Sequence, residues 1–136
     1  MGMFDWDSRY DIGVDAMNRE HRILLDLMAR LQALCDERAA KPTVVALLDK
    51  LAAYTVQHFR DEEAYMESIQ YADRKLHGVI HKQLLDKLEG HRVAFVSGPS
   101  ATLSPDFFHF LKGWLSAHII GIDMKYGAVA KQKKSA

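Results

Sequence analysis

The chain has 136 residues, 49% of them hydrophobic, which is enough for one domain with a substantial core. Its 18 basic and 18 acidic side chains balance, so the charge does not indicate a nucleic acid or an anionic membrane as partner. No apolar run approaches the length of a membrane-spanning helix, and the early acidic residues do not resemble a signal peptide. Because Cys35 is the only cysteine, an intrachain disulfide is impossible, which favours a reducing compartment. We expect residues 1–136 to form a single domain and a cytoplasmic monomer.

An arm and a first helix open the chain. Residues 1–17 have no lasting hydrophobic period, so we expect an extended arm laid across the domain. A helix over about residues 18–39 follows, with Asn18 or Asp15 as its candidate N-cap. Its core-facing positions recur at helical spacing and are Leu24, Met28, Leu31 and Cys35.

Two further helices occupy the middle of the chain. Pro42 is tolerated in a first helical turn, where its missing N–H has no partner, and it predicts a helix over about residues 42–68. The core-facing stripe of this helix is Val44, Leu48, Leu51, Thr55, His58, Glu62 and Met66. Asp73 is a candidate cap for a third helix, over about residues 73–96. The stripe of the third helix is His77, His81, Leu84, Leu88 and Phe95.

A fourth helix is predicted after the break at "SGPSATLSPD". Ser104, Pro105 and Asp106 supply a cap, a first-turn proline and a favourable first-turn charge for a helix over about residues 104–122. Its stripe is Phe107, Leu111, Trp114, Leu115, His118 and Ile122, and a short C-terminal tail would follow. Four amphipathic helices with short loops and no strand-like alternation predict an all-α, antiparallel up-down-up-down four-helix bundle with an extended N-terminal arm.

Side chains able to bind a metal interrupt the core stripes of all four predicted helices. A buried imidazole or carboxylate costs free energy unless it finds a partner. In an antiparallel bundle the starts of the first and third helices lie level with the ends of the second and fourth, so these groups would converge at one end. The seven candidate ligands are His21, His58, Glu62, His77, His81, His118 and Asp123.

Seven ligands suit two metal ions, because one zinc ion takes about four. Without a metal, the same groups would be seven costly buried polar side chains without obvious partners. Imidazole and carboxylate without thiolate favour iron, manganese or zinc over copper(I) or a cluster. If both carboxylates and one oxygen atom bridge the ions, five histidines leave one ion a ligand short of six, which opens one position. His91 and His109 have no partner at ligand spacing, and we expect ordinary structural roles for them.

The arrangement resembles the hemerythrin family, above all its bacterial single-domain members. The segments that carry the resemblance are "GVDAMNREHR", "HFRDEE", "HGVIH" and "WLSAHIIGIDMKY". Together they combine the patterns H, HxxxE, HxxxH and HxxxxD in this order, and they cover nearly the whole chain. The resemblance implies two non-haem iron ions, bridged by an oxo or hydroxo group and by the carboxylates of Glu62 and Asp123.

The resemblance also implies a role for each histidine. The ligands of a six-coordinate iron would be His77, His81 and His118, and those of the second iron, where dioxygen docks, His21 and His58. Trp114 lies one turn before the fourth-helix histidine and Ile119 directly follows it. Both are candidates for the lining of the dioxygen pocket, and both would equally serve as ordinary core residues.

The function implied by the resemblance is reversible dioxygen binding for oxygen carriage, storage or delivery, by a protein that is not an enzyme. Dioxygen would be the ligand, and an oxygen-consuming protein is the kind of partner to expect. The alternatives are an oxygen or redox sensor and a di-iron enzyme that handles peroxide or nitric oxide. Ferritin-like di-iron enzymes use Glu-x-x-His pairs and more carboxylates, whereas this sequence contains no Glu-x-x-His.

The spacing of the last two candidate ligands conflicts with a regular helix. His118 and Asp123 are five residues apart, which places them about 140° apart around an α-helix, so both cannot point squarely into one site. Gly121 lies between them and lowers the resistance of the backbone to unusual geometry. The sequence therefore predicts a π-type turn or a helix end within residues 118–123.

Overall fold

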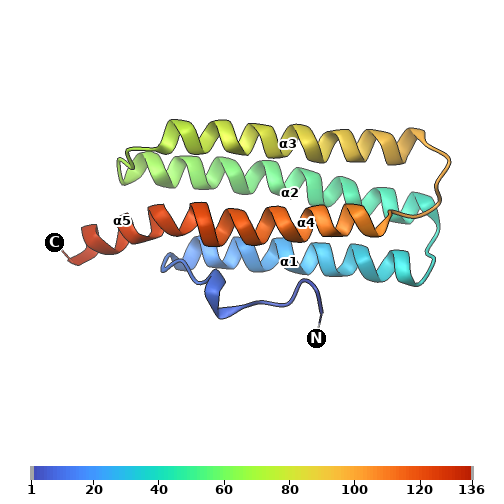
Figure 1. Cartoon of the computed structure of the whole chain (residues 1–136), viewed down its shortest axis with the longest axis horizontal. Helices are drawn as coiled ribbons and strands as arrows, with labels where there is room; N and C mark the ends of the chain where they lie inside the picture. The colour runs from blue at the N-terminus through green and yellow to red at the C-terminus, as the bar shows by residue number, and fades with distance from the viewer. Residues whose placement is uncertain (1, 136) are drawn as a thin grey trace.

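The structure is a computed structural model that describes residues 2–135, and this range contains helices and loops but no strand (Figure 1). The helices are α1 (Asp15–Asp36), α2 (Lys41–Ser68), α3 (Arg74–Ser97), α4 (Pro105–His118) and α5 (Met124–Ser135). A 3₁₀-helix, η1 (Ser8–Tyr10), lies in the N-terminal arm, and a π-helical turn, η2 (Ile119–Asp123), joins α4 to α5.

The helices run alternately up and down, which confirms the predicted antiparallel four-helix bundle (Figure 1). The α1–α2 and α3–α4 connections lie at one end of the molecule, and the α2–α3 connection lies at the other (Figure 1). α2 packs against both α1 and α3, and α4 packs against α1. The starts of α1 and α3 therefore meet the ends of α2 and α4 at the same level.

The predicted core stripes are largely buried. Every stripe residue of α2 is at most 1% exposed, including its polar members. Full burial of one aliphatic side chain stabilises the fold by roughly 1.5–3 kcal/mol, so these stripes supply the main driving force for packing. Three predicted stripe residues, Cys35, Leu84 and Ile122, remain partly exposed. Ile122 lies within η2, where the wider π turn rotates it off the stripe and the fully buried Ile119 takes the inward position.

The start of α1 differs from the prediction, because the helix begins at Asp15, three residues early. Neither predicted cap serves: the N-cap residue is Val14, without a side-chain bond, and Asp15 lies inside the first turn, where its charge favours the helix dipole. Asn18 Oδ1 instead accepts a hydrogen bond from the Ile12 N–H at 3.1 Å, and Asn18 Nδ2 donates to Asp11 Oδ1 at 2.8 Å. Asn18 thus ties the arm to the helix.

The other predicted caps lie at the expected positions. Asp73 is the N-cap residue of α3, although its side chain makes no capping hydrogen bond. Ser104 Oγ accepts a hydrogen bond from the Phe107 N–H at 3.3 Å, and Pro105 occupies the first turn of α4. The sequence therefore predicted both the position and the capping hydrogen bond at the start of α4, but only the position of the cap residue at the start of α3.

The C-terminal segment is a helix, so the prediction of a tail after residue 122 was wrong. The π turn keeps the backbone hydrogen-bonded, and α5 continues to Ser135. Tyr126 and Ala130 are buried, which gives α5 a packed face. Gly127 lies close against the arm, since a Cβ atom there would be 2.1 Å from the Ile12 carbonyl oxygen. The hydrophobic period is broken at the π turn, so the pattern did not extend to this helix.

The arm packs along α4, as expected for a segment laid across the domain. The hydroxyl of the buried Tyr10 lies 2.9 Å from Ser116 Oγ and accepts a hydrogen bond from Lys112 Nζ at 2.9 Å. Near the chain start, the rings of Phe4 and Phe108 pack edge to face with centroids 6.4 Å apart. These contacts hold both ends of the arm on the bundle.

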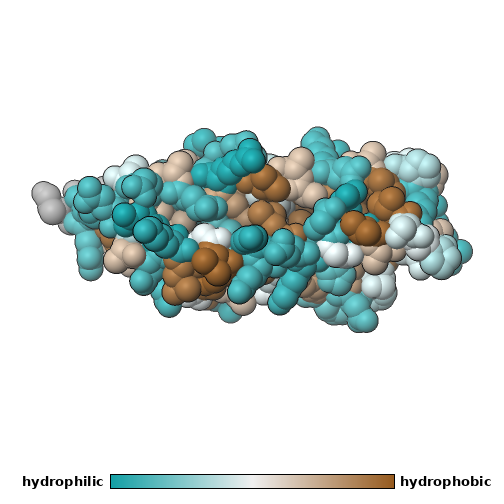
Figure 2. Space-filling model, turned by 90° about the horizontal axis from the view of Figure 1, so that it is seen from above, coloured by the Kyte–Doolittle hydropathy of each residue, from teal (hydrophilic) through white to brown (hydrophobic). Residues whose placement is uncertain are grey.

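Exposed hydrophobic side chains on α3 form two separate pairs, Leu76 with Val79 and Val93 with Val96. Hydrophilic side chains separate the hydrophobic groups on the face seen in Figure 2. Among the described residues, no helix combines the length and the apolar character that crossing a membrane requires.

A backbone feature after α1 leads to a testable prediction. Arg38 adopts a φ of 56°, and the next residue closes the helix through a 2.9 Å bond from the Ala39 N–H to the Leu34 carbonyl. The left-handed conformation costs a non-glycine residue roughly 1–2 kcal/mol. Glycine removes this strain, but its greater freedom in the unfolded chain offsets part of the gain. We therefore expect Arg38→Gly to raise the free energy of unfolding by about 0.5–1 kcal/mol in urea titrations. Arg38→Ala keeps the strain, so an equal gain from both variants would contradict this account.

Candidate metal centre

All seven predicted ligand residues meet in one cluster inside the bundle, at the end that holds the α2–α3 connection. Each of them is at most 4% exposed, although all are polar. The cluster draws on every long element: His21 from α1, His58 and Glu62 from α2, His77 and His81 from α3, and His118 and Asp123 from α4 and η2. Among the described residues, the two groups of histidines and carboxylates that could hold a metal ion contain no residue beyond the seven predicted ones.

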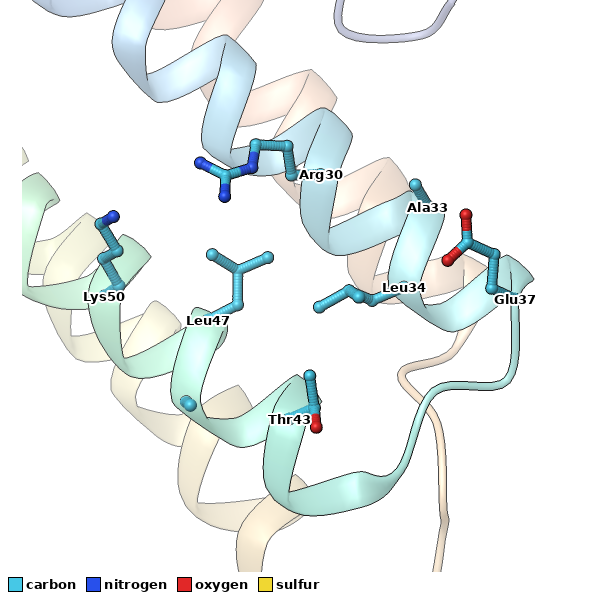
Figure 3. A pocket seen from close by; sticks show the side chains of 8 residues that line it. Arg30, Ala33, Leu34, Glu37, Thr43, Leu47 and Lys50 are labelled. Carbon is cyan, nitrogen blue, oxygen red and sulfur yellow. The ribbon is translucent and has the colours of Figure 1, made fainter.

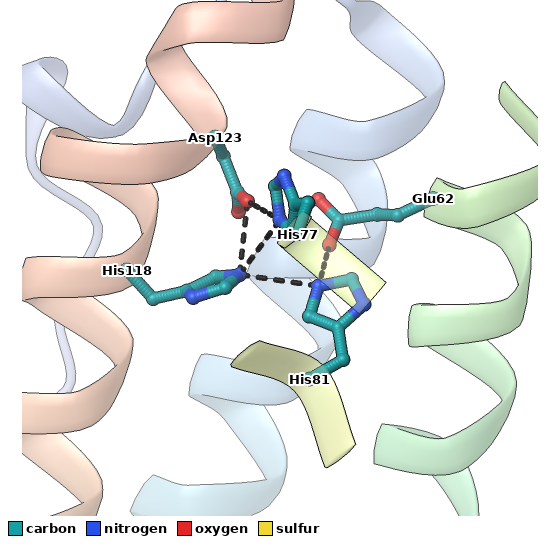
Figure 4. A group of neighbouring side chains, drawn as sticks. All are labelled: Glu62, His77, His81, His118 and Asp123. Atoms are coloured by element: carbon teal, nitrogen blue, oxygen red, sulfur yellow. Dashed lines mark hydrogen bonds and ion pairs between the residues drawn. The ribbon is translucent and has the colours of Figure 1, made fainter. Parts of the chain in front are cut away.

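Three histidines and two carboxylates form the first group, shown in Figure 4. His118 Nε2 lies 3.1 Å from His77 Nε2 and 3.2 Å from His81 Nε2. Asp123 Oδ1 lies 3.0 Å from the Nε2 atoms of His77 and His118, and Glu62 Oε1 lies 3.1 Å from His81 Nε2. Two nitrogen ligands about 2.1 Å from one ion and at right angles to each other lie about 3 Å apart. These spacings therefore fit a single metal ion.

The second group consists of His21, His58 and Glu62. Glu62 Oε2 lies 3.3 Å from His21 Nε2, and Glu62 Oε1 lies 3.5 Å from His58 Nε2. Asp123 also reaches this group, since its Oδ2 atom lies 3.1 Å from His21 Nε2. Both carboxylates thus lie between the two groups and contact each of them.

Burial and the facing charges set the protonation of these carboxylates. Burial alone would raise the pKa of Asp123, but His118 and the other facing imidazoles hold that pKa well below its usual value. Burial and the charge of Asp123 would raise the pKa of Glu62, yet His58 and His21 hold it at about 2. Burial lowers the pKa of His21, but the facing carboxylates of Asp123 and Glu62 raise it to about 9. Both carboxylates are therefore ionised at neutral pH, as metal binding requires.

Hydrogen bonding within the protein does not satisfy the cluster. Four inward-facing atoms have no hydrogen-bond partner among residues 2–135, namely His21 Nε2, Glu62 Oε1 and both carboxylate oxygens of Asp123. Asp123 Oδ2 faces His21 Nε2 at 3.1 Å, but neither atom makes a hydrogen bond of normal geometry within the described chain. Unpaired buried polar atoms are costly, and cations bound between these groups would remove much of that cost. The donor set of imidazoles and carboxylates without thiolate suits iron, manganese or zinc.

The helix that carries His118 and Asp123 changes geometry between them, which confirms the predicted π turn. η2 spans Ile119–Asp123, and the Met124 N–H bonds back five residues to the Ile119 carbonyl. The wider turn brings Asp123 onto the face that His118 already presents to the cluster. A regular helix would have placed the two side chains about 140° apart.

Tyr126 contacts the cluster from outside, although the sequence patterns assigned it no role. Tyr126 Oη donates a 2.5 Å hydrogen bond to Glu62 Oε2. Burial and the charge of Glu62 raise the pKa of Tyr126, so the phenol keeps its proton and remains a donor. Tyr126 lies on α5, where a tail was predicted; it is the last residue of the segment "WLSAHIIGIDMKY", but its spacing from the other candidates gave it no role.

Two glutamates also contact the cluster. Glu20 Oε1 lies 2.7 Å from His58 Nδ1, and Glu63 Oε2 lies 3.1 Å from His81 Nδ1. Each of these glutamates is the immediate sequence neighbour of a predicted ligand, Glu20 of His21 and Glu63 of Glu62. An acidic residue beside a ligand is a signal that could have identified them, because metal-binding histidines commonly donate their outer N–H to a carboxylate.

Aromatic and aliphatic side chains surround one side of the cluster. The ring of Phe59 stacks on His81 with centroids 3.7 Å apart and planes 4° from parallel. Trp114 packs edge-on against Phe59 at 5.9 Å, and Ile119 is fully buried beside His118 in the chain. Trp114 therefore approaches the cluster through Phe59, which sequence patterns did not single out although it directly follows His58.

The hollow shown in Figure 3 and the ring of His91 lie apart from this cluster. A surface hollow of about 540 Å³ lies between the C-terminal half of α1 and the start of α2 (Figure 3). Glu37 is its only carboxylate and no histidine lines it, so it offers no comparable metal site. His91 packs between the rings of Phe107 and Phe110, at centroid distances of 5.4 and 4.6 Å. This contact is an ordinary structural role, as expected.

The fold and the cluster together define a helical-bundle protein with a cation site of histidines and carboxylates. Residues 12–130 match the family model described as "Hemerythrin HHE cation binding domain". The chain belongs to the hemerythrin family. Membership implies non-haem iron held by histidine and carboxylate ligands, in a family of oxygen-binding proteins.

Individual relatives agree over most of the chain. Myohemerythrin of Riftia pachyptila is 33% identical over 121 residues, which are 89% of this chain and 88% of that protein. Bacteriohemerythrin of Stenotrophomonas maltophilia (strain R551-3) is 26% identical over 131 residues, which are 96% of this chain and 84% of the relative. The crystal structure of a wild-type hemerythrin matches with a TM-score of 0.84 at 25% identity and covers 92% of this chain and 95% of its own.

The position of Glu62 between the two groups leads to a test. Glu62→Gln keeps the shape of the side chain but removes its charge, so we expect metal affinity to fall by about 100-fold or more, above the 10–100-fold typical of residues outside the ligand set. Titration of metal-free protein with Fe²⁺, with circular dichroism to monitor folding, measures this effect. Glu67→Gln is the matched control on the same helix, because its side chain is 71% exposed and pairs only with Arg74 at the surface. Equal losses from both variants would contradict the assignment of Glu62.

The π turn leads to a second test, based on metal removal. η2 ends at Asp123, whose Oδ1 atom lies 3.0 Å from His118 Nε2 in the cluster, so we expect bound metal to stabilise the unusual backbone geometry of this turn. We expect removal of the metal to increase amide exchange first across residues 118–126, with little change across the hydrophobic residues 44–51 of α2. Hydrogen–deuterium exchange of metal-free and metal-bound protein measures this difference. Unchanged protection across residues 118–126 would refute the coupling.

Proposed function

We propose that this protein binds dioxygen reversibly at a non-haem di-iron centre and serves oxygen carriage, storage or delivery. The observation that carries the proposal is a pair of adjoining, fully internal ligand groups that share Glu62. Two iron ions, bridged by an oxo or hydroxo group and two carboxylates, would supply the two electrons that dioxygen takes up and returns. The cation-binding family description and the relatives named myohemerythrin and bacteriohemerythrin support this function.

The ligand set follows the two groups. We assign His77, His81 and His118 to one ion, His21 and His58 to the other, and Glu62 and Asp123 to both. The assignment is supported by the contacts of both carboxylates with imidazoles of each group. An unequal division of the histidines leaves the two-histidine ion with the open position at which dioxygen would bind.

The surrounding residues give the site its chemical character. Phe59, Trp114 and Ile119 form the proposed lining of the dioxygen pocket, and their apolar surfaces admit an apolar gas while excluding water. Such an environment also resists the release of a charged, partly reduced product. The phenol of Tyr126 stays protonated and donates a hydrogen bond to Glu62 Oε2, which orients that carboxylate.

An oxygen or redox sensor is the second candidate. Tyr126 connects Glu62 directly to α5, so a change at the cluster could move the C-terminal helix that another protein would read. We do not propose an enzyme, since neither the ligand set nor its apolar surroundings offers a second substrate a group to bind. The free thiol of Cys35 fits a reducing compartment, and the divided hydrophobic surface of α3 fits a monomer, so we propose a cytoplasmic monomer with an oxygen-consuming protein as the kind of partner.

Metal analysis combined with spectroscopy tests the proposed function. We expect two irons per chain, and a reduced protein whose absorption spectrum changes on exposure to air and returns when oxygen is removed. A carrier should keep its oxygen adduct through many such cycles, whereas a catalyst would oxidise within a few. One tightly bound zinc ion without iron reconstitution would exclude the di-iron centre.

A further inference from the structure

The ring of His81 is held from three sides by α2. Phe59 stacks on its face, Glu62 Oε1 lies 3.1 Å from its Nε2 atom, and Glu63 Oε2 lies 3.1 Å from its Nδ1 atom. The three residues lie within five consecutive positions of one helix, while His81 comes from the neighbouring helix α3. The carboxylates of two consecutive residues thus lie beside the two ring nitrogens of one imidazole.

We propose that Glu63 is a positioning residue for His81, and that Gly78 keeps the space that the Glu63 carboxylate needs. The inference rests on the proposed di-iron function, because it assigns Glu63 a role toward a ligand of that site. When His81 Nδ1–H donates to Glu63, the lone pair of Nε2 is left free for a metal. Glu63 therefore selects the tautomer and the orientation that metal binding needs.

Gly78 is in contact with this carboxylate across the α2–α3 interface. A Cβ atom at residue 78 would lie 3.2 Å from Glu63 Oε1, which is tighter than an ordinary contact. Glycine is otherwise an unfavourable residue in a helix interior. Gly90 lies on the same helix, and a Cβ atom there would meet nothing within 4 Å. The nearby Glu63 carboxylate is thus a steric reason for glycine at position 78, and no such neighbour exists at position 90 among the described residues.

Glu63 also lies at the surface, unlike the cluster itself. Its side chain is 46% exposed, compared with 18% for Glu20, which contacts His58. It lines a groove of about 470 Å³ between α2 and α3, together with Glu67, Arg74, Lys75, Gly78, Val79 and Lys82. A single hydrogen bond therefore separates a solvent-exposed carboxylate from a proposed iron ligand, so Glu63 can be changed without opening the core.

Substitution of Glu63 tests the positioning role. In metal-free protein, ¹⁵N spectra of His81 should show Nδ1–H in the wild type and a mixture of tautomers in Glu63→Ala. Titration with Fe²⁺ and with Co²⁺ should show about 10–100-fold weaker binding of one ion to Glu63→Ala. Glu63→Gln retains an acceptor oxygen and should lose less. Glu67→Ala, a change in the same groove, is the control and should leave both readouts unchanged.

Substitution of Gly78 tests the steric part without touching the carboxylate. Alanine is the better helix former, so we expect metal-free Gly78→Ala and Gly90→Ala to melt at the same temperature as wild type or up to about 5 °C higher. Only Gly78→Ala should bind metal more weakly, since its Cβ displaces Glu63. A loss of affinity without a loss of stability separates positioning from general damage to the fold.

The outcomes distinguish this inference from the proposed function. A wild-type protein that takes up no second ion would overturn the di-iron proposal, while the His81 tautomer in metal-free protein would still report on Glu63. A wild type that binds two ions, with unchanged affinity and tautomer in Glu63→Ala and unchanged affinity in Gly78→Ala, would overturn the inference. Equal losses of affinity in Gly78→Ala and Gly90→Ala would overturn its steric part.

Discussion

Five imidazoles and two carboxylates occupy one water-excluding end of this bundle, and their burial is the constraint that the surrounding structure must meet. An isolated buried charge costs several kcal/mol or more, so such groups persist only when they face opposite charges or cations. The two carboxylates each contact imidazoles from several helices, which offsets part of that cost. The remainder must be offset by the hydrophobic core toward the other end of the bundle, where α2 buries Val44, Leu48 and Leu51 completely.

The bundle topology divides the molecule into these two regions. Each long helix carries aliphatic stripe residues toward one end and candidate ligand residues toward the other, and the alternation of direction brings like regions together (Figure 1). The seven side chains come from four separate helices, so the displacement of any one helix would disrupt the cluster. The cluster consequently links elements that are distant in sequence, such as His21 and Asp123.

Groups outside the ligand set complete the site from three directions. Tyr126 reaches Glu62 from α5, Glu20 reaches His58 from α1, and Glu63 reaches His81 from α2. All three contact atoms of proposed ligand residues, so they can orient these donors and adjust their basicity without binding a metal themselves. The π turn belongs to the same set of adaptations, because it allows one helix to supply two ligands at a spacing that a regular helix would not permit.

The sequence by itself determined the bundle, the seven polar residues that cluster and the π turn, because each depends on spacing along a helix and on the chemistry of single side chains. Helical periodicity placed His58 and Glu62 on a buried face, and the five-residue spacing of His118 and Asp123 conflicted with regular geometry. Only the tertiary structure decided that α5 continues to Ser135, that Tyr126 donates to Glu62, and that Gly78 leaves room for Glu63 beside His81. These contacts join residues of different helices, and their formation depends on the distance and rotation between helices, which periodicity within one helix does not specify.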